Sequence, residues 1–319
     1  MLMPDNALNK KFMLLTVDVE DWFQVENFKS YISHASWSSR ELRVEQNTHR
    51  LLDLFDSAFR QKTHAVRATF FILGWIARRL PNLIREIHAR GHEVASHGMD
   101  HGLCNKVSPE ALAKDLIDSR KLLEDIIGHK IDGYRAPSFS IDNDILKIIA
   151  DCGYTYDSSY NSFAMHSRYG HIDIPQNGKK GIAIQISKTD HAISTKPTIN
   201  SQQSTILHEL PISNLKFKIQ NFILPWGGGA YFRLMPFSVF RRGIKAILKK
   251  NDAYLFYMHP WEIDPDQPRV RQAAPSLKFR HYVNQKKTCK KLERMLHSFS
   301  HCRFASCREY LEELATERL

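Results

Sequence analysis

The chain has 319 residues, of which 43% are hydrophobic and 25% are charged. This balance is typical of a folded globular protein and excludes disordered, collagen-like and coiled-coil classes. The formal net charge of +11 would suit an anionic partner. Because the basic residues are scattered and accompany no nucleic-acid-binding motif, we expect no nucleic-acid partner.

Targeting signals and cysteine pairs are both missing from the sequence pattern. No stretch approaches the roughly 18 consecutive apolar residues of a membrane-spanning helix, so we expect no transmembrane segment. The N-terminus lacks the basic, long apolar and small-residue regions of a secretory signal peptide, which predicts a cytoplasmic protein. Peripheral association with the inner membrane face fits this location and the basic composition. The five cysteines include no C-x-x-C pair, so we expect buried thiols.

Strand and helix patterns alternate along most of the chain. Short apolar runs predict buried strands, and apolar residues at helical spacing predict the helices between them. In chain order we expect a strand over 13–17, a helix over 47–60, a strand over 68–73, a helix over 75–89, a strand over 93–96, a helix over 109–127, a strand ending at Tyr134, a helix over 143–152, a strand over 154–156 and a last core strand over 254–258. This alternation predicts an α/β fold with parallel strands, either a barrel or an open sheet.

Two regions depart from the alternation. Residues 170–207 are polar and weakly periodic, which indicates a long insertion that forms either an excursion over the surface or a lid. After residue 265 the chain becomes a basic tail with helical patterns near 287–296 and 308–319. We therefore expect one domain over 1–265, including the insertion, and a C-terminal extension over 266–319 packed on it.

A histidine pair is the first chemical signal. His97 and His101 follow the predicted strand over 93–96, where a turn can bring two imidazoles four residues apart onto one face, as a tetrahedral metal site needs. His92-Glu93 is followed by His97 one residue too late for the H-E-x-x-H motif of zinc proteases, and the segment reads as a strand. We reject that motif.

Acidic residues end the first predicted strand, in the segment Thr16-Val17-Asp18-Val19-Glu20-Asp21. A carboxylate cluster in the apolar mouth of a barrel is costly unless a cation or a proton compensates the repulsion. Three other strand ends carry matching groups, in RAPSF (135–139), YDSS (156–159) and MHPWE (258–262). Because the carboxyl ends of parallel strands converge on one face, these groups predict an active site there.

Five ordered motifs resemble those of the NodB-homology polysaccharide deacetylases, also called carbohydrate esterase family 4. They are TVDVED, SHGMDH, RAPS, YDSS and FYMHPWE. The segments GGGAYFRLMP and HYVNQKK…KLERML are most similar to the branch associated with exosortase-type exopolysaccharide gene clusters. The resemblance implies a distorted (β/α)7 barrel with a small C-terminal extension. It also implies a hydrolase that removes N-acetyl groups from the amino sugars of a polysaccharide or its lipid-linked precursor.

The resemblance further implies one divalent metal ion, most often zinc, with Co²⁺, Ni²⁺ or Mn²⁺ as alternatives. Its ligands would be His97, His101 and an acidic residue of the first motif. Most relatives have two adjacent aspartates there, whereas Val19 follows Asp18 in this chain. Strand alternation puts Glu20 on the same face as Asp18, so Glu20 is the preferred ligand, and Asp21 is the alternative.

The same resemblance implies catalytic roles for four side chains. Asp18 would be the general base and His259 the general acid, Arg135 would orient Asp18 and keep it ionised, and Asp157 would tune His259. The backbone N–H of Ser138 matches the family's oxyanion donor.

Aromatic and glycine-rich neighbours of the motifs have open interpretations. Trp22 and Trp261 are predicted as a sugar-stacking platform, with core packing as the alternative. Gly227-Gly228-Gly229 lacks the spacing of a phosphate loop and favours a tight turn near the site. Arg233 would either meet an anionic substrate or cap a surface.

Two other functions compete with the deacetylase. One is a metal-independent cyclic-amide hydrolase of the same fold, similar to allantoinases and imidases, which the departure at Val19 keeps open. The other is a catalytically inactive polysaccharide-binding protein. The retention of Asp18, Arg135 and His259 together disfavours the second, because binding alone needs no general base or acid.

Overall fold

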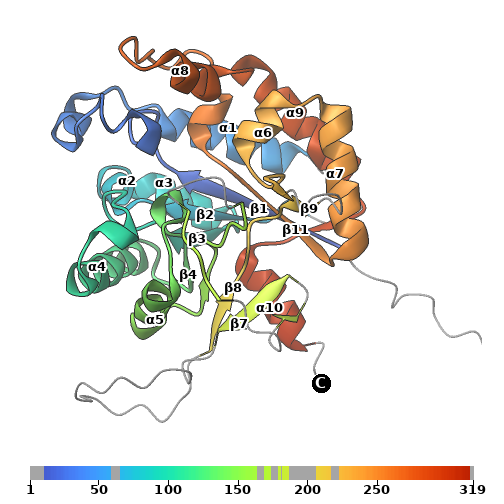
Figure 1. The fold of residues 1–319 in the computed structure, drawn as a ribbon, viewed down its shortest axis with the longest axis horizontal. Coiled ribbons are helices and arrows are strands. Elements are labelled where there is room, and N and C mark those ends of the chain that lie inside the picture. Colours follow the sequence, from blue (N-terminus) through green and yellow to red (C-terminus); the bar gives the residue numbers. More distant parts are fainter. Residues whose placement is uncertain are drawn as a thin grey trace, which may run out of the picture.

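The computed structural model of the chain describes residues 11–58, 65–163, 169–173, 179–180, 182–186, 206–216 and 223–316. A curled sheet runs through the molecule, and helices lie around it (Figure 1). β1 (Phe12–Val19) pairs in parallel with β2 (Ala68–Ile72) on one side and with β11 (Ala253–Met258) on the other. All eight residues of β1 are buried, as expected for a central strand covered on both faces.

The parallel part of the sheet has the strand order β11-β1-β2-β3-β4-β5-β8. Its other members are β3 (Glu93–Ser96), β4 (Gly133–Tyr134), β5 (Tyr156–Asp157) and β8 (Leu207–Glu209). β7 (Ala183–Ile186) and then β6 (Lys179–Lys180) continue the sheet as antiparallel strands. The parallel series confirms the predicted α/β class and is consistent with a distorted (β/α)7 barrel.

The helices of the first half follow the predicted order. They are α1 (Val44–Ser57), α2 (Gly74–Arg79), α3 (Pro81–Ala89), α4 (Pro109–Ile127) and α5 (Asn143–Asp151). The limits of α4 agree with the prediction, because Ser108 caps its first turn and Gly128 ends it in the left-handed region at φ 71°. The single helix expected over 75–89 is two helices, since Pro81 lacks an N–H and starts a new one.

The second half contributes further helices and short strands. They are β9 (Leu215–Lys216), β10 (Ile223–Leu224), α6 (Gly229–Leu234), α7 (Phe237–Lys250), α8 (Pro275–Tyr282), α9 (Gln285–Ser298), β12 (Arg303–Phe304) and α10 (Cys307–Thr316). β12 pairs in parallel with β1, so the end of the chain joins the sheet. A domain limit at residue 265 stays a prediction. Much of the expected insertion, including residues 187–205, lies outside the described residues.

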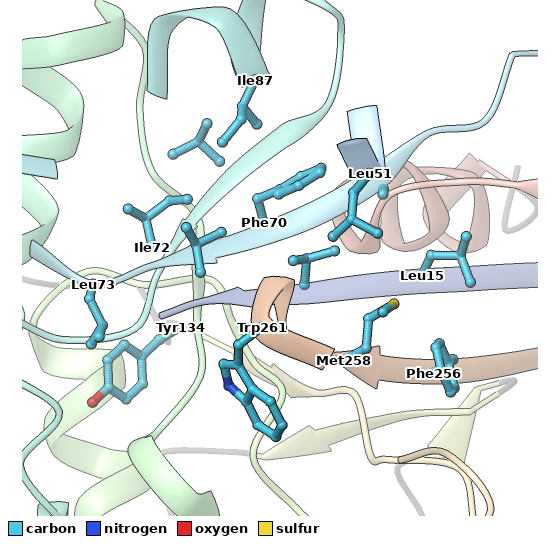
Figure 2. Close-up of a cluster of buried hydrophobic side chains, with 14 of the residues drawn as sticks. Leu15, Leu51, Phe70, Ile72, Leu73, Ile87, Tyr134, Phe256, Met258 and Trp261 are labelled. Atoms are coloured by element: carbon cyan, nitrogen blue, oxygen red, sulfur yellow. The ribbon is translucent and has the colours of Figure 1, made fainter. Parts of the chain in front are cut away.

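Successive side chains of β1 point to opposite faces of the sheet and therefore lie in two different environments. Met13, Leu15 and Val17 belong to the larger hydrophobic cluster, where helices α1 and α3 cover the sheet, as Figure 2 shows for Leu15, Leu51 and Ile87. Phe12 and Leu14 belong to a second cluster, formed with residues of neighbouring strands. Asp18 continues the Phe12–Leu14 side by strand alternation. A polar group therefore stands at the end of an apolar interior face.

The part of the chain that the structure describes contains no helix that is both long and apolar enough to cross a bilayer.

Candidate active site

The predicted site residues converge at the carboxyl ends of the parallel strands. Asp18 lies near the end of β1 and Glu20 just beyond it, while His97 follows β3 and His259 follows β11. Together with His101 they line one pocket. Side chains from both halves of the chain also contribute to its wall: Val25, Glu26, Asn27, Ala136, Ser138, Phe139, Tyr169, Ala230, Arg233, Tyr257, Trp261, Glu262, Arg280 and His281.

Arg135 connects two strand ends beneath the pocket through hydrogen bonds. Its guanidinium is fully buried and donates through Nη1 to Asp18 Oδ1 and to Thr16 Oγ1, each at 2.7 Å. Its Nε and Nη2 donate to the backbone carbonyl and the hydroxyl of Ser158, each at 2.8 Å. Burial alone would raise the pKa of Asp18, but Arg135, His97 and His259 outweigh it and lower that pKa. Asp18 is therefore ionised and fixed in direction.

Glu20, His97 and His101 form a three-residue cluster suited to a cation. One potential ligand atom from each lies within 4.8 Å of the others, and all three side chains are buried. Glu20 Oε2 lies 3.0 Å from His101 Nε2, yet it is a buried oxygen that accepts no well-formed hydrogen bond. Burial raises the pKa of Glu20 to about 7. A carboxylate and two imidazoles gathered in this way fit a divalent ion of the zinc type.

The tautomer of His97 follows from its contact with the backbone. His97 Nδ1 lies 2.7 Å from the carbonyl oxygen of Arg135, and since a carbonyl only accepts, Nδ1 carries the hydrogen. Burial lowers the pKa of His97 to about 4, so the ring is neutral. Nε2 is then left as a lone-pair donor. A backbone carbonyl that orients a ligating imidazole is common in metal sites.

Asp21 serves a different purpose from Glu20. Its carboxylate accepts from the backbone N–H groups of Trp22, Arg43 and Val44 at 2.7 to 2.9 Å, where helix α1 begins. Burial raises the pKa of Asp21 to about 6, although these three donors favour its ionised form. Of the two acidic candidates, the structure therefore places Glu20 beside the histidines and uses Asp21 to start a helix.

His259 is held by a carboxylate that the sequence interpretation missed. Its Nδ1 lies 2.9 Å from Glu262 Oε1, and its Nε2 lies 3.1 Å from Glu20 Oε1 and 3.9 Å from Asp18 Oδ2. Burial disfavours the imidazolium, but Glu20, Glu262 and Asp18 outweigh it and raise the pKa of His259 to about 9. His259 is thus protonated. A signal was present, because His259 and Glu262 occupy the N-cap and N3 positions of a capping box on the short 3₁₀ helix Pro260–Ile263.

Arg233 lines the pocket and pairs with Glu262, and it does not cap the surface. Its Nε donates to Glu262 Oε2 at 2.7 Å, and only 1% of Arg233 is exposed. The remaining guanidinium nitrogens donate to backbone carbonyls of Arg280, His281 and Val283. Together with His259, Arg233 lowers the pKa of Glu262 against the opposing effect of burial. Arg233 therefore fixes the charge and the direction of the group that holds His259.

The glycine run explains how α6 comes so close to this carboxylate. A Cβ on Gly229 would lie 2.3 Å from both carboxylate oxygens of Glu262, so no larger residue fits. Gly228 forms a parallel bridge with Tyr257 on β11. The run is thus a close approach of backbone to the site, made by a bridge residue and the start of α6 where we expected a tight turn.

Ser138 lies in a strained segment beside the pocket. It has φ 51°, and Phe139 has φ 59°, both in the left-handed region that residues other than glycine rarely adopt. Within the described residues, the backbone N–H of Ser138 donates no hydrogen bond, whereas those of Phe139 and Ser140 bond to Ala136 and Pro137. An N–H left free at the pocket wall suits the predicted oxyanion donor.

One predicted catalytic residue, Asp157, makes its contacts elsewhere. Asp157 does not serve His259, because its carboxylate accepts from the N–H and hydroxyl of Ser159 and lies beside Glu209, and burial raises the pKa of both carboxyls. Glu262 takes the role that we expected of Asp157.

The indole rings also separate into two roles. Trp22 is buried in the core, where its Nε1 donates to the carbonyl of Glu41, and it does not line the pocket. Packing therefore replaces the platform expected of Trp22. Trp261 does line the pocket, but its ring stacks between the rings of His259 and His281 at centroid distances of 5.0 and 4.1 Å. It acts as a support for His259.

Two family models match adjacent parts of the chain. Residues 7–156 match the polysaccharide deacetylase family. The first half of the chain is a polysaccharide deacetylase domain. Residues 158–312 match a domain of unknown function, DUF3473. The deacetylase domain supplies Asp18, Arg135 and the three-residue cluster, and the second half supplies His259 with Glu262 and Arg233. The candidate site therefore needs both halves.

Curated relatives of the deacetylase domain are named as deacetylases of peptidoglycan N-acetylglucosamine and of chitooligosaccharides. A peptidoglycan-N-acetylglucosamine deacetylase of Bacillus cereus is 29% identical over 107 residues, which is 34% of this chain and 47% of that protein. A chitooligosaccharide deacetylase of a Bradyrhizobium species is 31% identical over 91 residues, which is 28% of this chain and 42% of that protein. The chain spans less than half the length of these relatives.

Solved structures support the fold. A protein from Mycobacterium smegmatis assigned to the polysaccharide deacetylases has a TM-score of 0.59 at 18% identity, over 100% of this chain and 94% of that one. PuuE allantoinase has a TM-score of 0.57 at 13% identity, over 95% and 90% of the two chains. The deacetylase-type structure and the allantoinase structure thus share this architecture. The fold therefore leaves both functions open, and only the residues of the site can distinguish them.

Exchanging the two neighbouring acidic residues for amides should separate their roles. Glu20→Gln is expected to weaken zinc binding at least about 100-fold, because it removes a charged ligand, with little loss of fold. Asp21→Asn is expected to keep zinc binding but to lower the free energy of unfolding by about 1–2 kcal/mol, because it weakens three backbone contacts. Zinc competition against a chromogenic chelator and urea denaturation measure the two effects. The reverse pattern would make Asp21 the ligand.

Proposed function

We propose that this chain is a metal-dependent hydrolase that removes N-acetyl groups from the amino sugars of a polysaccharide or its lipid-linked precursor. The observation that carries the proposal is one pocket that joins an ionised Asp18, a protonated His259 and a cluster of Glu20, His97 and His101. A binding protein has no need for a buried acid and a buried base side by side, since both are costly to bury.

A divalent ion held by Glu20, His97 and His101, with zinc favoured, would lower the pKa of a water molecule and polarise the acetyl carbonyl. Asp18 would take the proton of the attacking water through Oδ2, because Oδ1 is occupied by Arg135. The backbone N–H of Ser138 would donate to the oxyanion that develops on the acetyl oxygen. His259 would then give its proton to the departing amine, so that the sugar leaves as a neutral amine.

The sugar itself is inferred from relatives rather than from the pocket. The names of the relatives give deacetylation of peptidoglycan N-acetylglucosamine in one case and of chitooligosaccharides in the other. A role in exopolysaccharide synthesis rests on the GGGAYFRLMP and C-terminal segments, and it stays a prediction, as does the cytoplasmic location. Of the aromatic wall residues, Tyr169 would be the one to stack on a sugar ring, because the Trp261 ring is already stacked between His259 and His281.

Substrate comparison tests the proposal against the cyclic-amide alternative. Zinc-loaded full chain should release acetate from short N-acetylglucosamine oligosaccharides, and removal of zinc with a chelator should abolish the release until zinc is restored. Allantoin, as the control substrate, should remain unchanged. Hydrolysis of allantoin by the metal-free protein, without acetate release from any oligosaccharide, would contradict the proposal and favour the cyclic-amide hydrolase.

The Glu262 carboxylate offers a second test, since its two oxygens contact His259 and Arg233. Glu262→Gln should lower kcat at least about tenfold with KM nearly unchanged, because His259 loses the charge that keeps it protonated and oriented. Glu262→Asp should recover part of kcat. The control Glu293→Gln changes an exposed glutamate of α9 and should change neither constant. A rise in KM as large as the fall in kcat, or no fall in kcat, would contradict the assigned role.

A further inference from the structure

The positive charge of the chain is concentrated in one segment. Residues 234–296 contain 14 basic and five acidic residues, which accounts for nine of the eleven net positive charges. The sequence pattern made these residues look scattered, because helical spacing separates them. In the fold they belong to helices α7, α8 and α9 and to the loop before α8, and Figure 1 shows these helices with α6 on one side of the sheet.

Most of these cations are exposed and lack an acidic partner. The exposed ones are Arg241, Arg242, Lys245, Lys249, Lys250, Arg269, Arg271, Arg280, Lys286, Lys287, Lys290 and Arg294. Within the described ranges, none of them forms an ion pair with a carboxylate. Of the five acidic residues, only Asp266 and Glu293 are exposed. We call the surface formed by these twelve cations the basic face.

Large apolar side chains are exposed on the same helices. Phe279 on α8 is 62% exposed, Leu234 at the end of α6 is 49% exposed, and Val239 on α7 is 43% exposed. Phe279 is directly followed by exposed Arg280. A soluble polyanion would need the cations but not the apolar groups. Cations mixed with exposed phenylalanine and aliphatic side chains fit the interface of an anionic bilayer, where phosphates meet the cations and the apolar groups enter the headgroup region.

The basic face borders the candidate active site. Arg280 is one of its cations and also lines the pocket, next to His281. The C-terminal carbonyls of α8 are fixed by Arg233, which belongs to the network around His259. The orientation of α8 is therefore rigidly tied to the site.

We infer that the basic face docks on an anionic lipid bilayer, with Phe279, Leu234 and Val239 inserted at the interface. The mouth of the pocket then opens beside the membrane, within reach of a glycan carried on a lipid. This inference concerns docking alone and does not depend on the proposed chemistry.

Vesicle binding by the full chain tests the inference. The chain should sediment with vesicles of phosphatidylglycerol and phosphatidylcholine but not with pure phosphatidylcholine, and added salt should weaken the binding. The triple variant Lys286→Glu, Lys287→Glu, Lys290→Glu should lower the partition coefficient about 100-fold or more, at roughly fivefold for each cation lost. Phe279→Ser should lower it about tenfold, from the apolar area no longer buried.

Matched controls lie on the opposite helix α4 and the turn before it. Lys106→Glu, Lys114→Glu, Lys121→Glu changes the same number of exposed charges, and Ile117→Ser removes an apolar side chain that is 51% exposed. The partition coefficients of both control variants should stay within about twofold of that of the unaltered chain, because the effect of net charge alone is small and screened by salt. Unchanged circular dichroism melting curves verify that every variant is folded.

Three results would overturn the inference. The first is failure to bind phosphatidylglycerol vesicles, and the second is an equal loss of binding in the α4 controls. The third is tight binding of soluble polygalacturonate with no effect of Phe279→Ser on vesicle binding. That last outcome would make the basic face a site for acidic polymers.

Discussion

The ion pair between Arg135 and Asp18 is the interaction on which the rest of the site depends. Three carboxylates, Asp18, Glu20 and Glu262, are buried within one barrel mouth, and ionised groups in that position repel one another and lose their hydration. Arg135 neutralises the first, Arg233 neutralises the third, and the cluster with His97 and His101 leaves a place for a cation at the second. Each of the three buried carboxylates therefore lies beside a cation or beside a place for one.

The two halves of the chain divide this charge balance between them. The deacetylase domain carries Asp18, the proposed general base, and the metal-ligand candidates, whereas the second half carries His259, the proposed acid, and its support. His259 connects the two, since its Nε2 faces Glu20 and its Nδ1 faces Glu262. The ring stack of Trp261 between His259 and His281 then couples the acid to the end of α8. The proposed mechanism therefore gives the second half a function, because without it the proposed base has no partner acid.

Much of this arrangement could be predicted from the sequence because strand ends of a parallel sheet converge. Asp18, His97, Arg135 and His259 each follow an apolar strand, and the period of two in β1 favoured Glu20 correctly over Asp21 as the neighbour of the histidines. Contacts between distant segments could not be predicted in this way. Arg233 pairs with Glu262 only because α6 packs closely on Pro260–Ile263. Asp157 lies beside Glu209 because β5 pairs with β8. The basic face also emerges only when separate helices are placed together.

The most direct test of the central claim is acetate release by the zinc-loaded Asp18→Asn variant, measured beside zinc content and oligosaccharide binding. The account predicts that acetate release falls about 100-fold or more while both kinds of binding persist, because the amide cannot take a proton but keeps the shape of the carboxylate. Asp100→Asn, an exposed aspartate in the same histidine loop, is the matched control and should behave as the unaltered chain. Undiminished acetate release from Asp18→Asn would contradict the account.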